Sequence, residues 1–431
     1  MKTFRLILFV VLIAVSAALA VAKDSGVRVD AVKVDGVINP VTAEFLDKAV
    51  NQAAVDKAEA LVILLDTPGG LDTSMRLMVK TITGSPIPII TYVSPSGARA
   101  ASAGVFIMMA SPVAAMSPGT NIGAAHPVSV GGEKVEAEMA RKVENDAAAY
   151  IRSLAQKNGR NADWAEKAVR ESVSISETDA LNKNVIDIVA PNLDDLLAKV
   201  DGRKVVTSMG ERTLHTKGAA VVWHEMGARL RLLKAISDPN VAYVLMMIGM
   251  LGLFFELSNP GLILPGVLGG ISLILAFYSF QTLPVNYAGM MLILLAVVFL
   301  IAEVKVTSYG LLAVAGVISL VLGSVMLIDS PLPYMRISLS LILPAAATIT
   351  AFFMILVRAA VRARGARVST GAEGMVGAYG DARTDIEPGG SGDVYVMGSH
   401  WSAYSDTPVR KGERVVVTAI EGLKLKVTRK S

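Results

Sequence analysis

A serine lies in a run of small residues that could support nucleophilic chemistry. Ser102 is the middle residue of Ala-Ala-Ser-Ala-Gly, inside the stretch SPSGARAASAGVFIMMAS. A serine hydroxyl is a poor nucleophile at neutral pH and needs a base and donors for the oxyanion that develops. A helix predicted to begin at Ala103 would offer free main-chain N–H groups, with the N–H of Ala103 as one donor. The alternative interpretation is structural, with Ser102 a small residue at a strand-helix junction.

A Pro-Gly-Gly turn about 30 residues before Ser102 offers the second donor. The apolar run ALVILLDTP ends there, followed by Gly69 and Gly70. Glycine lets the main chain adopt unusual dihedral angles and approach a ligand closely. We expect the N–H of Gly70 to serve as the donor, with Gly69 as the alternative.

Strands and helices must position these residues. The apolar, β-branched runs at 60–68 and 87–95 end in Pro or Gly turns and predict buried parallel strands. Between them, LDTSMRLMVKTITG has apolar residues at helical spacing, and residues 135–156 predict a second amphipathic helix. Repeated strand-helix alternation indicates an α/β domain with right-handed crossovers.

The chain has the composition of a membrane protein. Hydrophobic residues make up 53% of the sequence and charged residues 18%, and the mean hydropathy is +0.53. Five apolar segments of 17 or more residues each approach the length of about 20 residues that a bilayer span needs. They favour spans over buried helices of a large soluble core, and they lack the internal charges of a transport pathway. The segments are 241–257, 260–280, 286–303, 308–328 and 337–357.

The N-terminus predicts export of the α/β domain. Lys2 and Arg5 precede an apolar stretch that ends in an A-x-A pattern, which is typical of a cleaved signal peptide over residues 1–22. An uncleaved signal anchor is the alternative, and it also exports the following domain. Five spans then bring the C-terminus inside, where the basic cluster RAAVRARGAR obeys the positive-inside rule. We therefore expect a multi-pass protein of the cell (inner) membrane, with the first domain extracytoplasmic.

The C-terminal residues 368–431 predict a small all-β barrel on the cytoplasmic side. Short alternating runs are separated by Gly-rich turns, which is typical of a five-stranded barrel. Aromatic residues are few and no basic groove pattern is present, so nucleic-acid binding is not expected. The chain has no cysteine, which excludes disulfides, cysteine-ligated metals and thiol catalysis. We expect no metal and no organic cofactor.

These motifs resemble a known family. DTPGGLDTS, SGARAASAGVFIMMAS and MSPGTNIGAAHPV look like the fold shared by Clp protease, signal peptide peptidase A and the crotonases. The complete layout resembles the long NfeD family of membrane-bound, stomatin-operon partner proteases. The resemblance implies a Clp/crotonase-like serine protease domain over residues 23–235, a transmembrane region over 241–358 with about five helices, and an OB-fold barrel over 368–431.

The resemblance also implies a Ser-Lys dyad, in which Lys142 is the base for Ser102. A lysine acts as a base when desolvation disfavours its ammonium form. Lys134 is a nearby competitor. His126 lies where a Clp-protease histidine would fall, but the aspartate that would orient it is replaced by Ser172, beside Glu171. His126 therefore stays as an alternative base.

The expected function is that of a membrane-bound serine endopeptidase. The resemblance implies cleavage of apolar peptide segments, a stomatin/prohibitin-like membrane protein as partner or substrate, and a homo-oligomer of two or more copies. The alternative is a non-catalytic membrane scaffold, in which the first domain is degenerate and the barrel organises stomatin-like proteins.

Overall fold

The computed structural model describes most of the chain. The described residues are 27–128, 136–258, 261, 263–281, 283–306, 308, 310–330, 335–364 and 372–430. The signal peptide predicted over residues 1–22 and the competing base Lys134 lie outside them.

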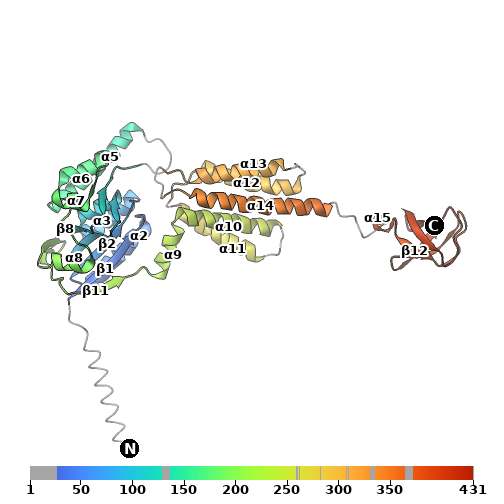
Figure 1. The fold of residues 1–431 in the computed structure, drawn as a ribbon, viewed down its shortest axis with the longest axis horizontal. Helices are drawn as coiled ribbons and strands as arrows, with labels where there is room; N and C mark the ends of the chain where they lie inside the picture. The colour runs from blue at the N-terminus through green and yellow to red at the C-terminus, as the bar shows by residue number, and fades with distance from the viewer. Residues whose placement is uncertain are drawn as a thin grey trace, which may run out of the picture. The chain divides into compact units, whose positions relative to one another are not determined.

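A six-stranded parallel sheet forms the centre of the N-terminal domain (Figure 1). Each strand pairs in parallel with its neighbours, as expected where helices or long loops connect successive strands. The order across the sheet is β11 (Ala220–His224), β1 (Arg28–Asp35), β2 (Ala60–Asp66), β3 (Ile89–Val93), β5 (Val113–Met116) and β8 (Ile188–Val189).

Both faces of this sheet are covered, because successive side chains of a strand point to opposite faces. In β2, Leu61, Ile63 and Leu65 join the larger core, whereas Ala60 and Val62 join the smaller one. The larger core contains residues of α2 (Pro40–Val55), α3 (Asp72–Thr83), α4 (Ala103–Ala110), α5 (Ala137–Lys157) and α6 (Ala162–Arg170); the smaller contains residues of α8 (Leu193–Val200).

Smaller elements complete this domain. A three-stranded sheet has the order β4 (Arg99–Ala101), β6 (Asn121–Gly123) and β7 (Ser174–Ser176), followed by the short helix α7 (Glu177–Asn182). A hairpin is formed by β9 (Lys204–Thr207) and β10 (Gly210–Thr213). Helix α9 (Ala228–Ile236) follows β11, and its Leu230 is buried in the larger core.

In the part of the apolar half that the structure describes, five helices lie at the positions of the five predicted segments (Figure 1). Among the described residues, α10 and α11 are long and apolar enough to cross a membrane, and the other three contain shorter apolar stretches. Helices α10 and α11 pack closely through glycines: a Cβ on Gly252 would lie 2.5 Å from the carbonyl oxygen of Pro265. The helices are α10 (Pro239–Ser258), α11 (Ile263–Phe280), α12 (Tyr287–Lys305), α13 (Leu311–Leu327) and α14 (Leu339–Arg364).

The C-terminal strands form a closed barrel, as predicted. Its interior is built from alternating apolar residues such as Val394 and Val396 on one strand and Val415 and Val417 on another. The strands are β12 (Tyr379–Ala382), β13 (Ser391–Val396), β14 (Ser399–Tyr404), β15 (Arg414–Glu421) and β16 (Lys424–Arg429), preceded by the short helix α15 (Ala372–Met375). The predicted fold class is confirmed: an α/β domain, an apolar helical region and a small all-β barrel.

Candidate active site

Ser102 occupies a strained turn between β4 and α4. Its φ of +51° and ψ of −113° lie in a region that residues other than glycine rarely adopt, at a cost of about 1–3 kcal/mol. The turn is held by the Ser102 N–H, which donates to the carbonyl of Gly123 at 3.1 Å. Ser102 is the N-cap residue of α4, yet its hydroxyl makes no capping hydrogen bond. The hydroxyl is therefore not used to stabilise the helix.

The end of β2 fixes the strand that leads to Ser102. The N–H of Thr67 donates to the carbonyl of Arg99 at 2.8 Å, and the N–H of Ala101 donates to the carbonyl of Thr67 at 3.0 Å. The first turn of α4 approaches Thr67 so closely that a Cβ on Gly104 would lie 2.8 Å from the Thr67 Cγ2. This close approach explains the glycine of Ala-Ala-Ser-Ala-Gly.

The two glycines after Pro68 have different hydrogen bonds. The Gly69 N–H donates to the Thr67 Oγ1 at 3.0 Å, and the Gly69 carbonyl accepts from the N–H of Ile38 at 2.8 Å. Within the described part of the chain, the N–H of Gly70 has no hydrogen-bond partner, and neither has that of Ala103. Gly70 and Ala103 thus have N–H groups available for a ligand, whereas the N–H of Gly69 is already used.

One pocket brings four of the predicted residues together. It has a volume of about 450 Å³, within the usual range for ligand sites. Gly70, Ser102, Ala103 and Lys142 line it, and Gly69 and His126 are not among its lining residues. Apolar side chains form much of the remaining wall: Leu71, Met75, Phe106, Val128 and Val143.

Lys142 lines this pocket from α5. Its side chain is 66% exposed, and its ammonium is paired with Glu138, one turn earlier on the same helix, at 3.0 Å. Among the described residues, the ammonium makes no hydrogen bond to Ser102. Lys142 would have to leave Glu138 to act on the serine hydroxyl.

His126 faces a different partner. Its Nδ1 donates to the main-chain carbonyl of Val169 at 2.9 Å, which places the ring proton on Nδ1. In the described residues no carboxylate contacts this ring, so the orienting group of a Ser-His-Asp triad has no counterpart here.

The sequence reasoning overlooked an ion-pair cluster at the pocket wall. Arg76 of α3 pairs with Asp72 at 2.9 Å and with Asp146 of α5. Its guanidinium also lies 4.6 Å from the ring centre of Tyr150. Arg76 therefore joins α3 and α5, two helices that both line the pocket. The i,i+4 spacing of Asp72 and Arg76 was the available signal, but it predicts an ordinary surface pair.

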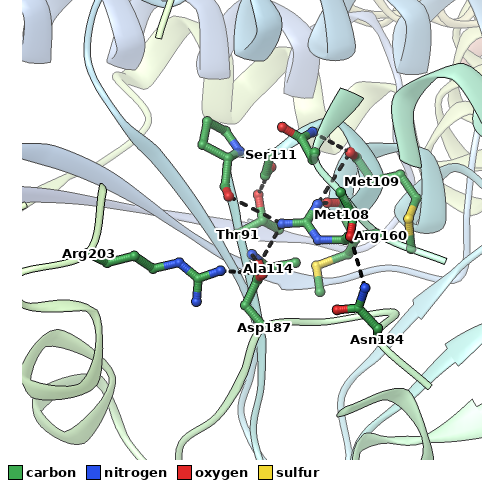
Figure 2. Close-up of polar contacts among 12 residues, drawn as sticks. Thr91, Met108, Met109, Ser111, Ala114, Arg160, Asn184, Asp187 and Arg203 are labelled. Atoms are coloured by element: carbon green, nitrogen blue, oxygen red, sulfur yellow. Dashed lines mark hydrogen bonds and ion pairs between the residues drawn. The ribbon is translucent and has the colours of Figure 1, made fainter. Parts of the chain in front are cut away.

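Arg160 was also overlooked, and it fixes the other end of α4. Figure 2 shows its guanidinium between the carboxylate of Asp187, at 2.6 Å, and the last carbonyls of the helix. It donates to the carbonyl of Met108 at 2.8 Å, while Asn158 donates to that of Met109 at 2.7 Å. These donors satisfy carbonyls that a helix end leaves without partners. Burial lowers the pKa of Arg160, and Asp187 opposes that shift.

Among the described residues, no three His, Asp or Glu side chains gather where they could hold a metal ion. The pocket brings together a hydroxyl, an amine and two main-chain donors. These are the components of serine acyl transfer.

Comparison with known families and proteins agrees with this picture. Three family models match in succession: the NfeD1b N-terminal domain over residues 28–196, the NfeD integral membrane domain over 240–359, and the NfeD-like C-terminal, partner-binding domain over 372–429. The chain is therefore a membrane protein.

Two relatives and one solved structure are similar to this chain. The membrane-bound protease PH1510 of Pyrococcus horikoshii is 37% identical over 413 residues, which are 92% of each chain. The membrane protein NfeD1b of Bacillus subtilis is 27% identical over 73% of this chain and 69% of its own length. A mutant of the 1510-N membrane-bound stomatin-specific protease, in complex with a substrate peptide, is 35% identical over 50% of this chain and 99% of that one, with a TM-score of 0.47. Through its three NfeD regions and its identity with PH1510 over nearly the whole length, this chain belongs to the NfeD family.

Proposed function

We propose that this protein is a membrane-bound serine endopeptidase that uses Ser102 and Lys142 as a catalytic dyad. The observation that carries the proposal is the single pocket in which Ser102, held at a positive φ, meets Lys142 and two free main-chain donors. Strain of this kind gathers at active sites, because the surrounding structure must hold it in place. The relationship to the protease PH1510 supports the same conclusion.

In the proposed reaction, the Ser102 Oγ attacks the carbonyl carbon of a peptide bond. The neutral amine of Lys142 accepts the hydroxyl proton and returns it to the leaving amine. An acyl-enzyme forms, and water then hydrolyses it with the same base. The ion pair with Glu138 must open first, so peptide binding beside α5 would have to release Lys142.

The N–H groups of Gly70 and Ala103 form the proposed oxyanion hole. Neither N–H has a hydrogen-bond partner among the described residues, and both residues line the pocket that contains Ser102. Losing one such donor typically costs about 10²–10³ in rate. Gly69 is the weaker candidate, because its N–H already donates to Thr67.

The pocket wall supports a preference for apolar peptide segments. Met75, Phe106 and Val143 would contact substrate side chains next to the cleaved bond. A stomatin-like membrane protein is the proposed substrate, because the 1510-N relative is stomatin-specific. We also propose a homo-oligomer, as the resemblance to Clp-type proteases implies. We propose that the protease domain lies outside the cytoplasm and the barrel inside, on the basis of the predicted signal peptide and of the basic cluster at residues 358–367, where α14 ends.

Labelling by a fluorophosphonate–rhodamine probe tests the proposal on the detergent-solubilised full chain. We expect the wild-type protein to be labelled, Ser102→Ala to be unlabelled, and Lys142→Ala to lose at least about 10²-fold in labelling rate. Ser153→Ala and Lys157→Ala, both at exposed positions of α5, are matched controls that should label normally. An unlabelled wild-type protein, or labelling that survives Ser102→Ala, would contradict the proposal.

A non-catalytic scaffold is the alternative, and one observation favours it. The Lys142 ammonium is exposed and already paired, as in an ordinary surface ion pair. A scaffold predicts that neither wild type nor Ser102→Ala reacts with the probe, whereas both retain binding to a stomatin-like protein through the C-terminal domain.

A further inference from the structure

Helix α9, which precedes the first membrane helix, reaches back to a loop beside the Pro-Gly-Gly turn. The Lys234 Nζ donates to the carboxylate of Asp35 and to its main-chain carbonyl, the latter at 3.1 Å. Lys234 therefore holds Asp35, which ends β1 and begins the loop that follows. We call residues Asp35–Asn39 the Asp35–Asn39 loop.

This loop fixes the Pro-Gly-Gly turn on both sides of Gly70. The Ile38 N–H donates to the carbonyl of Gly69 at 2.8 Å, and the Leu71 N–H donates to the carbonyl of Ile38 at 2.9 Å. The carbonyl of Gly69 and the N–H of Gly70 belong to one planar trans peptide group and point in opposite directions, so the N–H of Gly70 points away from Ile38. The contact is close: a Cβ on Gly70 would lie 2.0 Å from the Ile38 oxygen.

The two ends of the loop are held differently. Ile38 is fully buried in the larger core. The residues before it border a cavity of about 310 Å³, and Gly36, Val37 and Lys234 are among the residues that line this cavity. Where packing leaves this space, hydrogen bonds hold the start of the loop: those of Lys234 to Asp35, and that of the Gly36 N–H, which donates to the carbonyl of Asp66 at 2.9 Å.

We propose that Lys234 is a positioning residue for the oxyanion hole, which acts through Asp35 and Ile38 on the N–H of Gly70. This rests on the proposed serine protease function and extends it: the helix next to the membrane sets the position of a donor that lines the Ser102 pocket. A displacement of α9 would then lower the reactivity of Ser102 without any contact between α9 and the substrate.

A second ion pair on α9 provides the matched control. Arg229 pairs with Glu44 of α2 at 2.8 Å, and neither residue contacts the Asp35–Asn39 loop. Leu230 packs in the core and keeps the helix in place. Removing Arg229 therefore weakens the docking of α9 but leaves the loop held, whereas removing Lys234 releases the loop.

The test compares Lys234→Met, Asp35→Asn and Arg229→Met in the detergent-solubilised full chain. The rate of fluorophosphonate labelling reports the reactivity of Ser102, and inhibition by the peptide aldehyde acetyl-Leu-Leu-norleucinal is compared with that by the corresponding peptide amide. We expect Lys234→Met and Asp35→Asn to be labelled about 10-fold more slowly or worse. We also expect both variants to bind the aldehyde more weakly, because the aldehyde adduct places an oxygen in the oxyanion hole and the amide does not. Binding of the amide should be unchanged, and Arg229→Met should behave as wild type.

Rescue separates positioning from general stability. Lys234→Arg keeps a donor for Asp35, so we expect it to label faster than Lys234→Met and close to the wild-type rate. Equal labelling rates for wild type and Lys234→Met, or an equal loss in Arg229→Met, would overturn the inference while leaving the protease proposal intact. An unlabelled wild-type protein would instead refute the proposed function. If Lys234→Met does not fold, Asp35→Asn and Lys234→Arg decide the question.

Discussion

Replacing Gly70 by alanine should abolish most of the activity while the protein stays folded. The new Cβ would lie 2.0 Å from the oxygen of Ile38 and 2.6 Å from its nitrogen, both main-chain atoms that cannot rotate away. The turn and the loop must therefore separate by roughly 1 Å or more, because a Cβ atom essentially never lies closer than 3.0 Å to another heavy atom outside its bonded neighbours.

The size of the effect follows from that displacement. A hydrogen bond of about 2.9 Å that lengthens by 1 Å is no longer a hydrogen bond, so one oxyanion donor is lost. We expect the labelling rate of Ser102 to fall by about 10²–10³, which corresponds to about 2.7–4 kcal/mol. The two hydrogen bonds between Ile38 and the turn contribute about 1 kcal/mol each to the free energy of unfolding, a minor part of about 5–15 kcal/mol.

Two measurements on each variant separate activity from folding. Fluorophosphonate labelling gives the reactivity of Ser102, and thermal unfolding gives the stability of the protein. Gly227→Ala is the matched control, because a Cβ there meets no atom within 4 Å and the residue has a negative φ. Labelling of Gly70→Ala at the wild-type rate would refute the assignment of Gly70 as an oxyanion donor.

Three other outcomes are expected. Arg160→Met should lower the free energy of unfolding by about 3–5 kcal/mol in urea titrations, because it leaves the buried carboxylate of Asp187 with one partly exposed cation, Arg203, besides the N–H of Ala114; an unchanged midpoint would contradict this. The hydrogen bond from Lys234 lowers the pKa of Asp35 below its ordinary 3.8. The interaction between ionised Asp35 and Lys234 therefore stabilises the fold fully above pH 3.8, and this stabilisation is lost as the pH falls through the lowered pKa. In Asp35→Asn, the free energy of unfolding should therefore fall less steeply as the pH is lowered below about 4 than in the wild type. The same dependence on pH in both proteins would exclude this role of Asp35. Val143→Asp should slow cleavage of apolar peptides more than labelling by the small probe, and equal losses would argue against Val143 as a substrate contact.

Local patterns were sufficient for several elements of the N-terminal domain. The apolar run ending in Pro68 became β2, the helical spacing before Gly84 became α3, and the helix predicted over 135–156 is α5, Ala137–Lys157. Each of these depends on side-chain periodicity within a single segment, which a sequence shows directly.

The details of the candidate site depend on contacts between distant segments. Gly69 and Gly70 are equivalent in sequence, and only the Thr67 side chain and the Ile38 main chain distinguish their N–H groups. Arg160 follows a helix in a run of polar residues, yet it is buried because Asp187 and the end of α4 meet around it. The ion pair of Lys142 with Glu138 did leave a signal, the i,i+4 spacing of a glutamate and a lysine on one helix, but that spacing predicts only an ordinary surface pair and not how Lys142 lies relative to Ser102.

The closed barrel limits how the C-terminal domain can recruit another protein. Every strand from β12 to β16 is hydrogen-bonded to a neighbour on both sides, so this domain presents no free edge to which a partner could add a strand. Recognition must then use side chains on the outer wall or the loops at either end of the barrel. Sequence changes in those loops could exchange one partner for another without disturbing the hydrogen bonds between the strands of the barrel.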